Sequence, residues 1–137
     1  YPLINRDILV VCGMFHDIGK LEELSSFPEN DYTDEGQLLG HIIIGTQQIA
    51  ARIATIPGFP KKLEAEIIHC ILAHHGELEY GSPKKPSLAE ALALSMADNM
   101  DAKLQTMKEL LQGDESKGEW LGFQRLFETN MRKSAEY

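Results

Sequence analysis

The sequence lacks a surplus of positive charge. Its 137 residues include 13 lysines and arginines against 21 aspartates and glutamates, which gives a formal net charge of −8 at pH 7. This balance argues against a broad nucleic-acid-binding face, because such faces neutralise phosphates with clustered basic side chains. Bound metal ions can supply positive charge locally, so the same balance leaves room for phosphate chemistry. The charge therefore disfavours a pure binding module more than it disfavours a metalloenzyme.

Long hydrophobic runs are also missing. The longest apolar stretch covers residues 8–15, far short of the ~20 residues that a membrane-spanning helix needs. The start of the chain shows no basic segment followed by a hydrophobic core and a cleavage site. We therefore expect no signal peptide, no membrane partner and a cytoplasmic location. The first residue is Tyr1 rather than a methionine, which indicates a piece of a longer protein.

Cysteines are scarce. Cys12 and Cys70 lie within helical patterns and show no CxxC spacing. They are interpreted as small buried hydrophobic residues in a reducing compartment, because neither a disulfide framework nor a zinc knuckle has this pattern.

No stretch alternates convincingly between apolar and polar residues at a period of two, so the sequence predicts an all-α fold. Its length suits a single domain, residues 1–137, in which residues 114–137 form a short helix or ordered arm that packs back on the helical bundle. Four helices are expected: residues 6–18 before a left-handed cap at Gly19, Thr33 to about residue 57, residues 61–75 before Gly76, and a capping box of Ser87 and Glu90 leading to about residue 112.

Histidines and aspartates gather at the ends and inside these expected helices. They are His16 and Asp17 in the first helix, His41 in the second, His74 and His75 in the third, and Asp98 in the fourth. Taken singly, each has an ordinary explanation: a core histidine, a favourable interaction with a helix dipole, or a solvated face. Together, four helices would bring inward-facing ligands to one place. Imidazole combined with carboxylate suits Mn, Fe, Ni or Zn, whereas a pure magnesium or calcium site is mostly oxygen.

The motifs that carry these residues resemble a known family. "FHDIGK", followed by a spaced histidine, then "HH" and then a helical "AD", is similar to the pattern of the HD superfamily of metal-dependent phosphohydrolases. More narrowly, "FHDIGKLEEL", "YTDEGQLLGHI", "ILAHHGELEYGSPKKP" and "ADNMDAKL" resemble the YhaM family of bacterial 3′–5′ exoribonucleases, also called CMP-binding factors. The resemblance covers most of residues 3–104 and implies an HD-domain helical bundle.

The resemblance also implies a role for the histidines and aspartates. They would hold two divalent metal ions, the first bound by His16, Asp17 and Asp98 and the second by His41 with His74, His75 or both. Asp17 would bridge the two ions, because a carboxylate has two oxygens. Mn²⁺ is the expected ion, with Fe, Ni, Zn and Mg as alternatives.

Other matched residues would act on the substrate. Asp17, Lys20 and His74 would form the catalytic set, in which Lys20 faces the phosphate or stabilises the site electrostatically. Lys84 and Lys85 would contact the nucleic-acid backbone, and a solvated turn explains these two lysines equally well. The implied activity is the hydrolysis of single-stranded RNA, or DNA, to 5′-mononucleotides by two-metal catalysis.

Two parts of the family pattern are not found in this sequence. The HD pattern has an earlier histidine ligand on the preceding helix, and the family carries an N-terminal OB-fold that binds single strands. Both would lie upstream of Tyr1. We therefore expect an HD domain truncated at its N-terminus, with weak or no activity as a fragment.

Two other functions stay open. The first is a nucleotide or cyclic-dinucleotide phosphohydrolase, although "HHGELEYGSPKKP" does not match the signature of the cyclic-dinucleotide branch. The second is a metal-poor module that binds nucleic acid without cleaving it. The metal content of the purified domain would separate the enzymes from the binding module. The sequence leaves the oligomeric state open.

Overall fold

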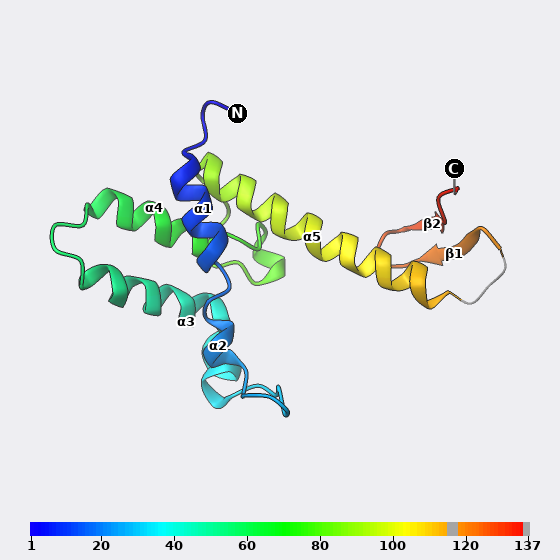
Figure 1. The fold of residues 1–137 in the computed structure, drawn as a ribbon, viewed down its shortest axis with the longest axis horizontal. Helices are drawn as coiled ribbons and strands as arrows, with labels where there is room; N and C mark the ends of the chain where they lie inside the picture. Colours follow the sequence, from blue (N-terminus) through cyan, green and yellow to red (C-terminus); the bar gives the residue numbers. More distant parts are fainter. Residues whose placement is uncertain (115–117, 136–137) are drawn as a thin grey trace. The chain divides into compact units, whose positions relative to one another are not determined.

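A computed structural model of the chain describes residues 1–114 and 118–135. It confirms the predominantly helical fold (Figure 1). The elements, in chain order, are α1 (Arg6–Phe15), α2 (Lys20–Glu23), α3 (Asp34–Ala54), α4 (Lys61–Leu72), the short 3₁₀ helix η1 (Leu78–Tyr80), α5 (Ala89–Gly113), β1 (Trp120–Gln124) and β2 (Thr129–Arg132). The chain divides into two compact units, with the boundary after residue 99, inside α5. Within the described ranges, each helix is too short or too polar to cross a lipid bilayer.

Side-chain caps fix the starts of α1 and α3. The Asn5 side chain accepts hydrogen bonds from the backbone amides of Asp7 and Ile8. The Thr33 hydroxyl accepts one from the Gly36 amide at 2.9 Å. These bonds satisfy amides that have no partner within the first turn of a helix. The expected helix start at Thr33 is therefore confirmed.

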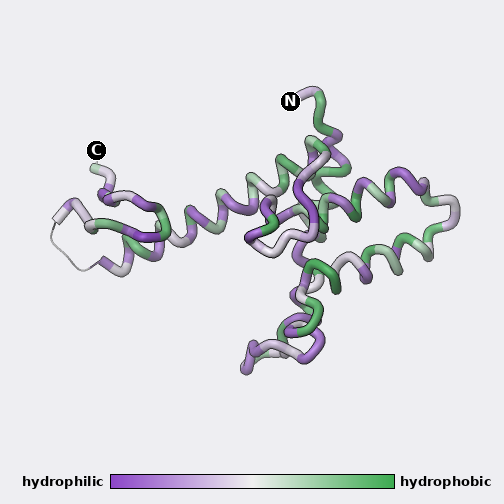
Figure 2. Tube along the Cα trace, turned by 180° about the vertical axis from the view of Figure 1, so that it is seen from behind, coloured by the Kyte–Doolittle hydropathy of each residue, from purple (hydrophilic) through white to green (hydrophobic). Residues whose placement is uncertain are grey.

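The core of the first unit lies between α1, α4 and the beginning of α5. Its buried members are Ile8, Cys12, Ile67, Cys70, Ile71, Ala73, Ala91 and Leu94. Both cysteines are fully buried and free, as expected for small hydrophobic residues. The trace of α5 alternates between hydrophobic and hydrophilic residues along its length (Figure 2), so one face of this helix can contribute to a core.

The chain turns after α1 in a different way from the one predicted. The helix ends at Phe15 rather than near Ile18, and Gly19 has a φ of −63° instead of a left-handed conformation. A Cβ added at Gly19 would lie 2.0 Å from the carbonyl oxygen of His41 and 2.6 Å from the amide nitrogen of Gly45. Glycine is needed at this position because the backbone of α3 passes directly against it. This close approach brings the turn between α1 and α2 next to the middle of α3.

The third long helix, α4, is shorter than predicted. It begins at Lys61, directly after Pro60 as expected, and ends at Leu72 rather than at the paired histidines. Gly76 does adopt the left-handed conformation, with a φ of 80°. His74 and His75 therefore lie in a turn between the helix and this glycine, outside the helical hydrogen-bonding pattern.

The predicted capping box at the start of α5 is wrong. The helix begins at Ala89, and the Ser87 hydroxyl donates to the carbonyl oxygen of Lys85 at 3.4 Å. The Glu90 carboxylate instead accepts a hydrogen bond from the backbone amide of Asn5 at 2.5 Å. A capping box needs reciprocal hydrogen bonds between its two members. Here the Glu90 side chain binds Asn5, a residue distant in the sequence, instead.

The second unit contains a β-hairpin where a short helix or an ordered arm was predicted. β1 pairs antiparallel with β2, and Phe123 lies opposite Asn130. The strands contain only five and four residues, too few for a period of two to stand out among the mixed spacings of the tail. Residues 115–117 and 136–137 of the expected arm lie outside the described residues, and its packing on the bundle stays a prediction.

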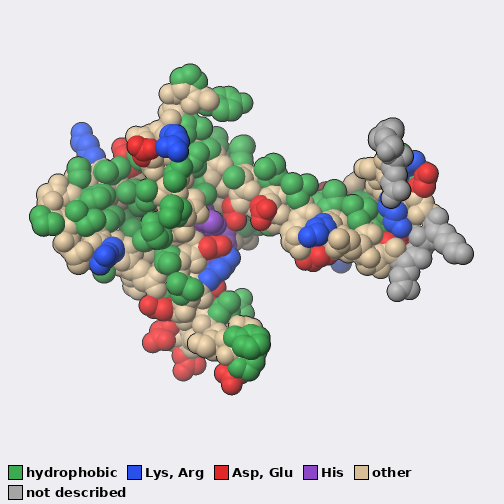
Figure 3. Space-filling model, viewed as in Figure 1, with side chains coloured by type: hydrophobic (Ala, Val, Ile, Leu, Met, Phe, Trp, Pro, Cys, Tyr) green, Lys and Arg blue, Asp and Glu red, His purple; other side chains and the backbone are tan. Residues whose placement is uncertain are grey.

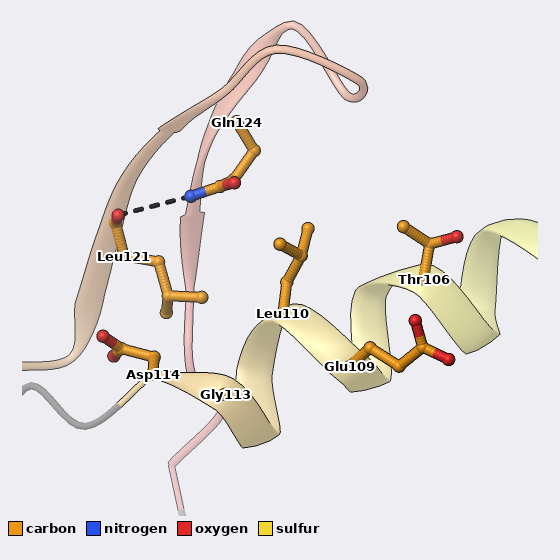
Figure 4. Close-up of a pocket in the computed structure, with 7 residues that line it drawn as sticks. All are labelled: Thr106, Glu109, Leu110, Gly113, Asp114, Leu121 and Gln124. Carbon is orange, nitrogen blue, oxygen red and sulfur yellow. Dashed lines mark hydrogen bonds between the residues drawn. The ribbon is translucent and has the colours of Figure 1, made fainter.

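A hollow of about 350 Å³ lies within this second unit, between the end of α5 and the hairpin (Figure 4). It is lined by Thr106, Glu109, Leu110, Gly113, Asp114, Leu121 and Gln124. Leu110 and Leu121 give it an apolar wall, and it contains none of the histidines singled out by the sequence.

Candidate metal centre

Helix ends and a helix break bring the predicted site residues together. His16 is the residue that caps α1, and Asp17 follows it. His41 comes directly after Gly40, whose φ of 72° and ψ of 156° interrupt α3. His74 and His75 follow the end of α4, and Asp98 lies within α5. Figure 3 shows a small patch of histidine surface beside acidic and basic side chains.

Asp17 lies at the centre of this cluster. Its Oδ1 atom is 3.5 Å from Nε2 of His41 and 3.7 Å from Nε2 of His74. Its Oδ2 atom is 3.4 Å from Nε2 of His16, and Lys20 donates a hydrogen bond to this oxygen at 2.7 Å. The two carboxylate oxygens of Asp17 therefore face different groups.

The six residues form two groups whose donor atoms lie within 4.8 Å of one another. The first group is His16, Asp17 and Asp98, and the second is His41, His74 and His75. Asp98 joins the first group through its Oδ1, which is 3.6 Å from Nε2 of His16. The division is the one that the resemblance implied, with Asp17 between the groups.

Three buried polar atoms at the centre have no hydrogen-bond partner among the described residues. They are Oδ1 of Asp17, Nε2 of His41 and Nε2 of His74. A buried polar atom without a partner costs about 1–3 kcal/mol, and such atoms are rare unless something else satisfies them. Because all three can offer a lone pair, a cation would satisfy them together. The residues present therefore fit a metal ion.

Backbone carbonyls hold the histidine rings in place. Nδ1 of His16 lies 2.9 Å from the carbonyl oxygen of Gly13, and Nδ1 of His74 lies 2.7 Å from that of Ile71. Nδ1 of His75 lies 2.9 Å from the carbonyl oxygen of Tyr80. A carbonyl oxygen only accepts hydrogen bonds, so these contacts assign the proton to Nδ1. With the proton on Nδ1, Nε2 is the ring atom that can bind a metal.

Burial and neighbouring charges set the protonation of two central groups. Burial lowers the pKa of His74 to about 4, and the imidazoles of His75 and His16 act in the same direction. Burial alone would raise the pKa of Asp17, but the Lys20 ammonium and the His16 ring outweigh it and hold this pKa below its usual value. At pH 7 His74 is therefore neutral and Asp17 is ionised, and these are the forms that coordinate metals.

The predicted lysines differ in how close they lie to this centre. Lys20 is hydrogen-bonded to Asp17, and its side chain is 47% exposed, so it borders the site. Lys85 forms an ion pair with Glu77 at 2.5 Å, and the hydrogen bond to this carboxylate raises the pKa of Lys85. Lys84 is exposed on the same loop. Neither of these two loop lysines belongs to the metal-binding groups.

One buried acid at this site was missed by the sequence analysis. Glu23, the last residue of α2, is 8% exposed, and its carboxylate contacts the backbone and the ring of His41. In the sequence it follows an equally acidic neighbour, Glu22, and local spacing does not distinguish the two. The signal lies only in the three-dimensional packing.

The chain is similar to proteins of one family. A family model described as the HD domain matches residues 2–103. The relatives include the 3′–5′ exoribonuclease YhaM of Shouchella clausii, which is 41% identical over 118 residues, and that of Bacillus subtilis, which is 39% identical over 116 residues. The protein of the same name from Listeria innocua is 40% identical over 112 residues. No solved structure matches the chain significantly.

These matches cover most of this chain but only a small part of each relative. Each match covers 82% of this chain, but 35% of the Shouchella and Bacillus proteins and 36% of the Listeria protein. The chain therefore spans about a third of the length of the curated relatives that it matches.

Proposed function

This chain belongs to the HD domain family, and on that premise we propose that it is the metal-dependent phosphodiesterase domain of a 3′–5′ exoribonuclease. The matched residues 2–103 include the whole histidine and aspartate cluster. The similar curated proteins carry the name 3′–5′ exoribonuclease. The proposal thus joins a site suited to metals with an activity named for relatives that share this part of the chain.

One observation carries the proposal. Oδ1 of Asp17 and the Nε2 atoms of His41 and His74 converge while buried and unpartnered among the described residues. Leaving such atoms unsatisfied destabilises a fold unless a ligand binds there. A structural histidine cluster would be expected to pair its ring nitrogens internally. The retained lone pairs favour a site built for cations.

We assign the ligands to two divalent ions. His16, Asp17 and Asp98 would hold one ion, and His41, His74 and His75 would hold the other, with the Asp17 carboxylate facing the first group through Oδ2 and the second through Oδ1. When bound, such ions supply positive charge to a phosphate and lower the pKa of a water molecule. Mn²⁺ is the ion that we favour, because mixed imidazole and carboxylate ligands suit borderline metals. Fe, Ni, Zn and Mg are the alternatives.

The chain's own residues would orient the substrate. The Lys20 ammonium already neutralises Oδ2 of Asp17 and is half exposed, so it can also face a phosphate oxygen. Lys84 and Lys85 lie on the loop that follows His75 and would contact the sugar–phosphate backbone. These local positive charges matter because the chain as a whole carries a net charge of −8.

We propose single-stranded RNA with a free 3′ end as the substrate and 5′-mononucleotides as the products. The name of the relatives supports RNA and the direction of cleavage. Single-stranded DNA is the second substrate to test, because phosphate contacts alone do not separate the two polymers. A cytoplasmic location follows from this proposed substrate.

Metal analysis and a nuclease assay on this chain test the proposal. The chain is stripped with chelator, reloaded with Mn²⁺ or Ca²⁺, and incubated in excess over 3′-hydroxyl RNA so that weak turnover is detected. We expect release of mononucleotides with Mn²⁺, none with chelator and little with Ca²⁺, which prefers a larger shell of oxygens. Asp17→Asn is the control for contaminating nucleases.

Two outcomes would overturn the proposal in different ways. Hydrolysis of cyclic dinucleotides or free nucleotides, with RNA left intact, would assign the site to another phosphohydrolase. RNA binding that is retained without bound metal and without cleavage would assign the domain to a binding module.

A further inference from the structure

We propose that Glu23 is a positioning residue of the metal centre: its carboxylate holds His41 in the tautomer and orientation that leave Nε2 free to bind a metal. The inference rests on the proposed metal-binding function and adds a residue to it. It concerns a side chain that is not itself one of the ligands.

Glu23 contacts His41 twice through the same oxygen. Oε1 accepts a hydrogen bond from the backbone amide of His41 at 2.9 Å and lies 3.1 Å from Nδ1 of its ring. Both side chains are largely buried, with 10% of the Glu23 side chain and 13% of the His41 side chain exposed. Anchoring the backbone and the ring at one point restricts rotation of the imidazole.

The break in α3 makes the backbone contact possible. Gly40 leaves the helical conformation, so His41 begins a new helical segment whose first amides lack carbonyl partners one turn earlier. The Glu23 carboxylate supplies that acceptor, much as a capping side chain does. The acid therefore stabilises the segment that carries the histidine as well as the ring.

The backbone of Glu23 is itself held against α3. The amide of Thr33 donates a hydrogen bond to the carbonyl oxygen of Glu23 at 2.9 Å. A Cβ added at Gly36 would lie 2.2 Å from the same oxygen, so glycine permits this close packing. The carboxylate is thus attached to a fixed point rather than to a mobile loop.

The tautomer determines whether His41 can act as a ligand. A carboxylate only accepts hydrogen bonds, so its contact with Nδ1 places the ring proton there. Without it, the neutral ring can carry its proton on Nε2, which lies 3.5 Å from Oδ1 of Asp17. Nε2 would then donate a hydrogen bond to Oδ1 of Asp17, and neither atom could bind the metal through a free lone pair. Glu23 prevents this internal pairing.

Two variants and a matched control test the inference on this chain. Glu23→Ala removes the acceptor, and Glu23→Gln keeps an oxygen that can accept from both nitrogens but removes the charge. Glu22→Ala is the control, because Glu22 is the exposed neighbour in the same short helix. The tautomer of His41 is read from ¹⁵N NMR of the metal-free protein at pH 8, and Mn²⁺ affinity from titration followed by EPR.

We expect the wild type and Glu22→Ala to have the proton on Nδ1 and the same Mn²⁺ affinity. Glu23→Ala should populate the Nε2–H form and bind Mn²⁺ about 10–100-fold more weakly, the usual effect of removing an outer-shell partner. Glu23→Gln should restore the Nδ1–H form and recover part of the affinity. If Glu23→Ala does not fold, the comparison of Glu23→Gln with the wild type still requires an unchanged tautomer and a weaker affinity.

Several results would overturn the inference. An Nε2–H tautomer in the wild type would do so, as would a folded Glu23→Ala variant with unchanged tautomer and affinity. Equal Mn²⁺ affinity of Glu23→Ala and Glu23→Gln, with different tautomers of His41, would show that the tautomer does not control metal binding. A wild-type chain that binds no metal would contradict the proposed function instead, because the tautomer measurement reports on Glu23 without any metal.

Discussion

Nε2 of His74 lies 3.7 Å from Oδ1 of Asp17, and neither atom has a hydrogen-bond partner within residues 1–114 and 118–135 although both are buried. The carbonyl oxygen of Ile71 holds the opposite ring nitrogen of His74 at 2.7 Å, so the ring turns a lone pair toward the carboxylate. Two acceptors that face each other inside a protein repel unless a cation lies between them. The arrangement of these two atoms therefore favours a metal ion between them.

Replacement of the shared carboxylate should stop catalysis without unfolding the chain. Asp17→Asn keeps the size of the side chain but removes the negative charge that faces both groups of ligands. Outer-shell changes at metal sites already cost about 10–100-fold in metal affinity or activity. We therefore expect a loss of at least about 100-fold in the rate of RNA hydrolysis. Hydrolysis measured with the chain in excess over RNA, together with circular dichroism to monitor folding, measures both effects.

Asp101→Asn is the matched control for this variant. Asp101 is an exposed aspartate of α5 and belongs to neither group of ligands. Its replacement should leave turnover and helix content unchanged. Near-normal activity of Asp17→Asn would rule out Asp17 as the shared ligand.

The metal-free protein should lose stability in mild acid because of His74. Burial lowers its pKa to about 4, whereas the pKa of an unfolded histidine is about 6.5. Between these values the unfolded chain binds the proton more readily, so protons favour unfolding. The contribution to stability is fully present above about pH 6.5 and is lost as the pH falls toward about 4. It amounts to up to about 3 kcal/mol in the free energy of unfolding.

Urea unfolding in the presence of chelator, at pH 7 and at pH 4.5, measures this loss. The pKa of Asp17 is also held below its usual value, so its protonation destabilises the fold in the same direction, at a lower pH. His74→Asn separates the two effects, because it removes only the imidazole. The fall in stability between the two pH values should be smaller in this variant. An equal fall in both proteins would show that His74 is not responsible.

The sequence predicted the site residues where imidazole or carboxylate side chains follow an apolar helical segment. His16, Asp17, His74 and His75 follow apolar helical faces, and these faces determine where each helix packs. The convergence of these residues could therefore be predicted from periodicity and motif. Their roles as ligands stay a prediction.

Other features depended on contacts between distant segments. Glu23 and Glu22 are equivalent in the sequence, but in the fold the Glu23 carboxylate is buried against His41 while Glu22 is exposed. Gly19 was interpreted as a helix cap, but its actual constraint comes from the backbone of α3. The hairpin in the tail has strands too short for a periodic signal.

The close approach at Gly19 predicts a large loss of stability for a small change. In Gly19→Ala the new methyl group would meet the carbonyl oxygen of His41 at 2.0 Å and the amide nitrogen of Gly45 at 2.6 Å. Backbone atoms cannot move away as a flexible side chain would, so the start of α2 and the helix α3 must separate. We expect a loss of about 1–3 kcal/mol or more in the free energy of unfolding, together with weaker Mn²⁺ binding.

Gly13→Ala provides the opposite case within the same region. Gly13 lies inside α1, and a Cβ added there meets no atom of the described part of the chain within 4 Å. Alanine is the better helix former by about 0.5–1 kcal/mol, so this variant should be slightly more stable than the wild type. Chemical unfolding of both variants provides the comparison. A Gly19→Ala variant as stable as Gly13→Ala would contradict the close packing of the start of α2 against α3.

The two groups of ligands should fill unequally. His41, His74 and the neighbouring His75 form a group of imidazoles in which His74 is fully buried, with Oδ1 of Asp17 beside it. In the other group, the side chains of Asp17 and Asp98 are 34% and 33% exposed, so water competes for the ion. Metal affinity depends on deprotonated, well-held ligands. We therefore expect one Mn²⁺ or Zn²⁺ ion to bind tightly at the histidine group and a second to bind more weakly.

Variants in the two groups distinguish the sites. His75→Ala should remove the tight site, and Asp98→Ala should remove the weak one while leaving about one equivalent of metal after dialysis. Catalysis should fail in both, since a single ion cannot stabilise both the attacking and the leaving oxygens of a phosphodiester. Elemental analysis after dialysis gives the stoichiometry, and anomalous scattering from crystals gives the positions. Two ions of equal affinity, or a tight ion lost on Asp98→Ala, would reverse the assignment of the ligands.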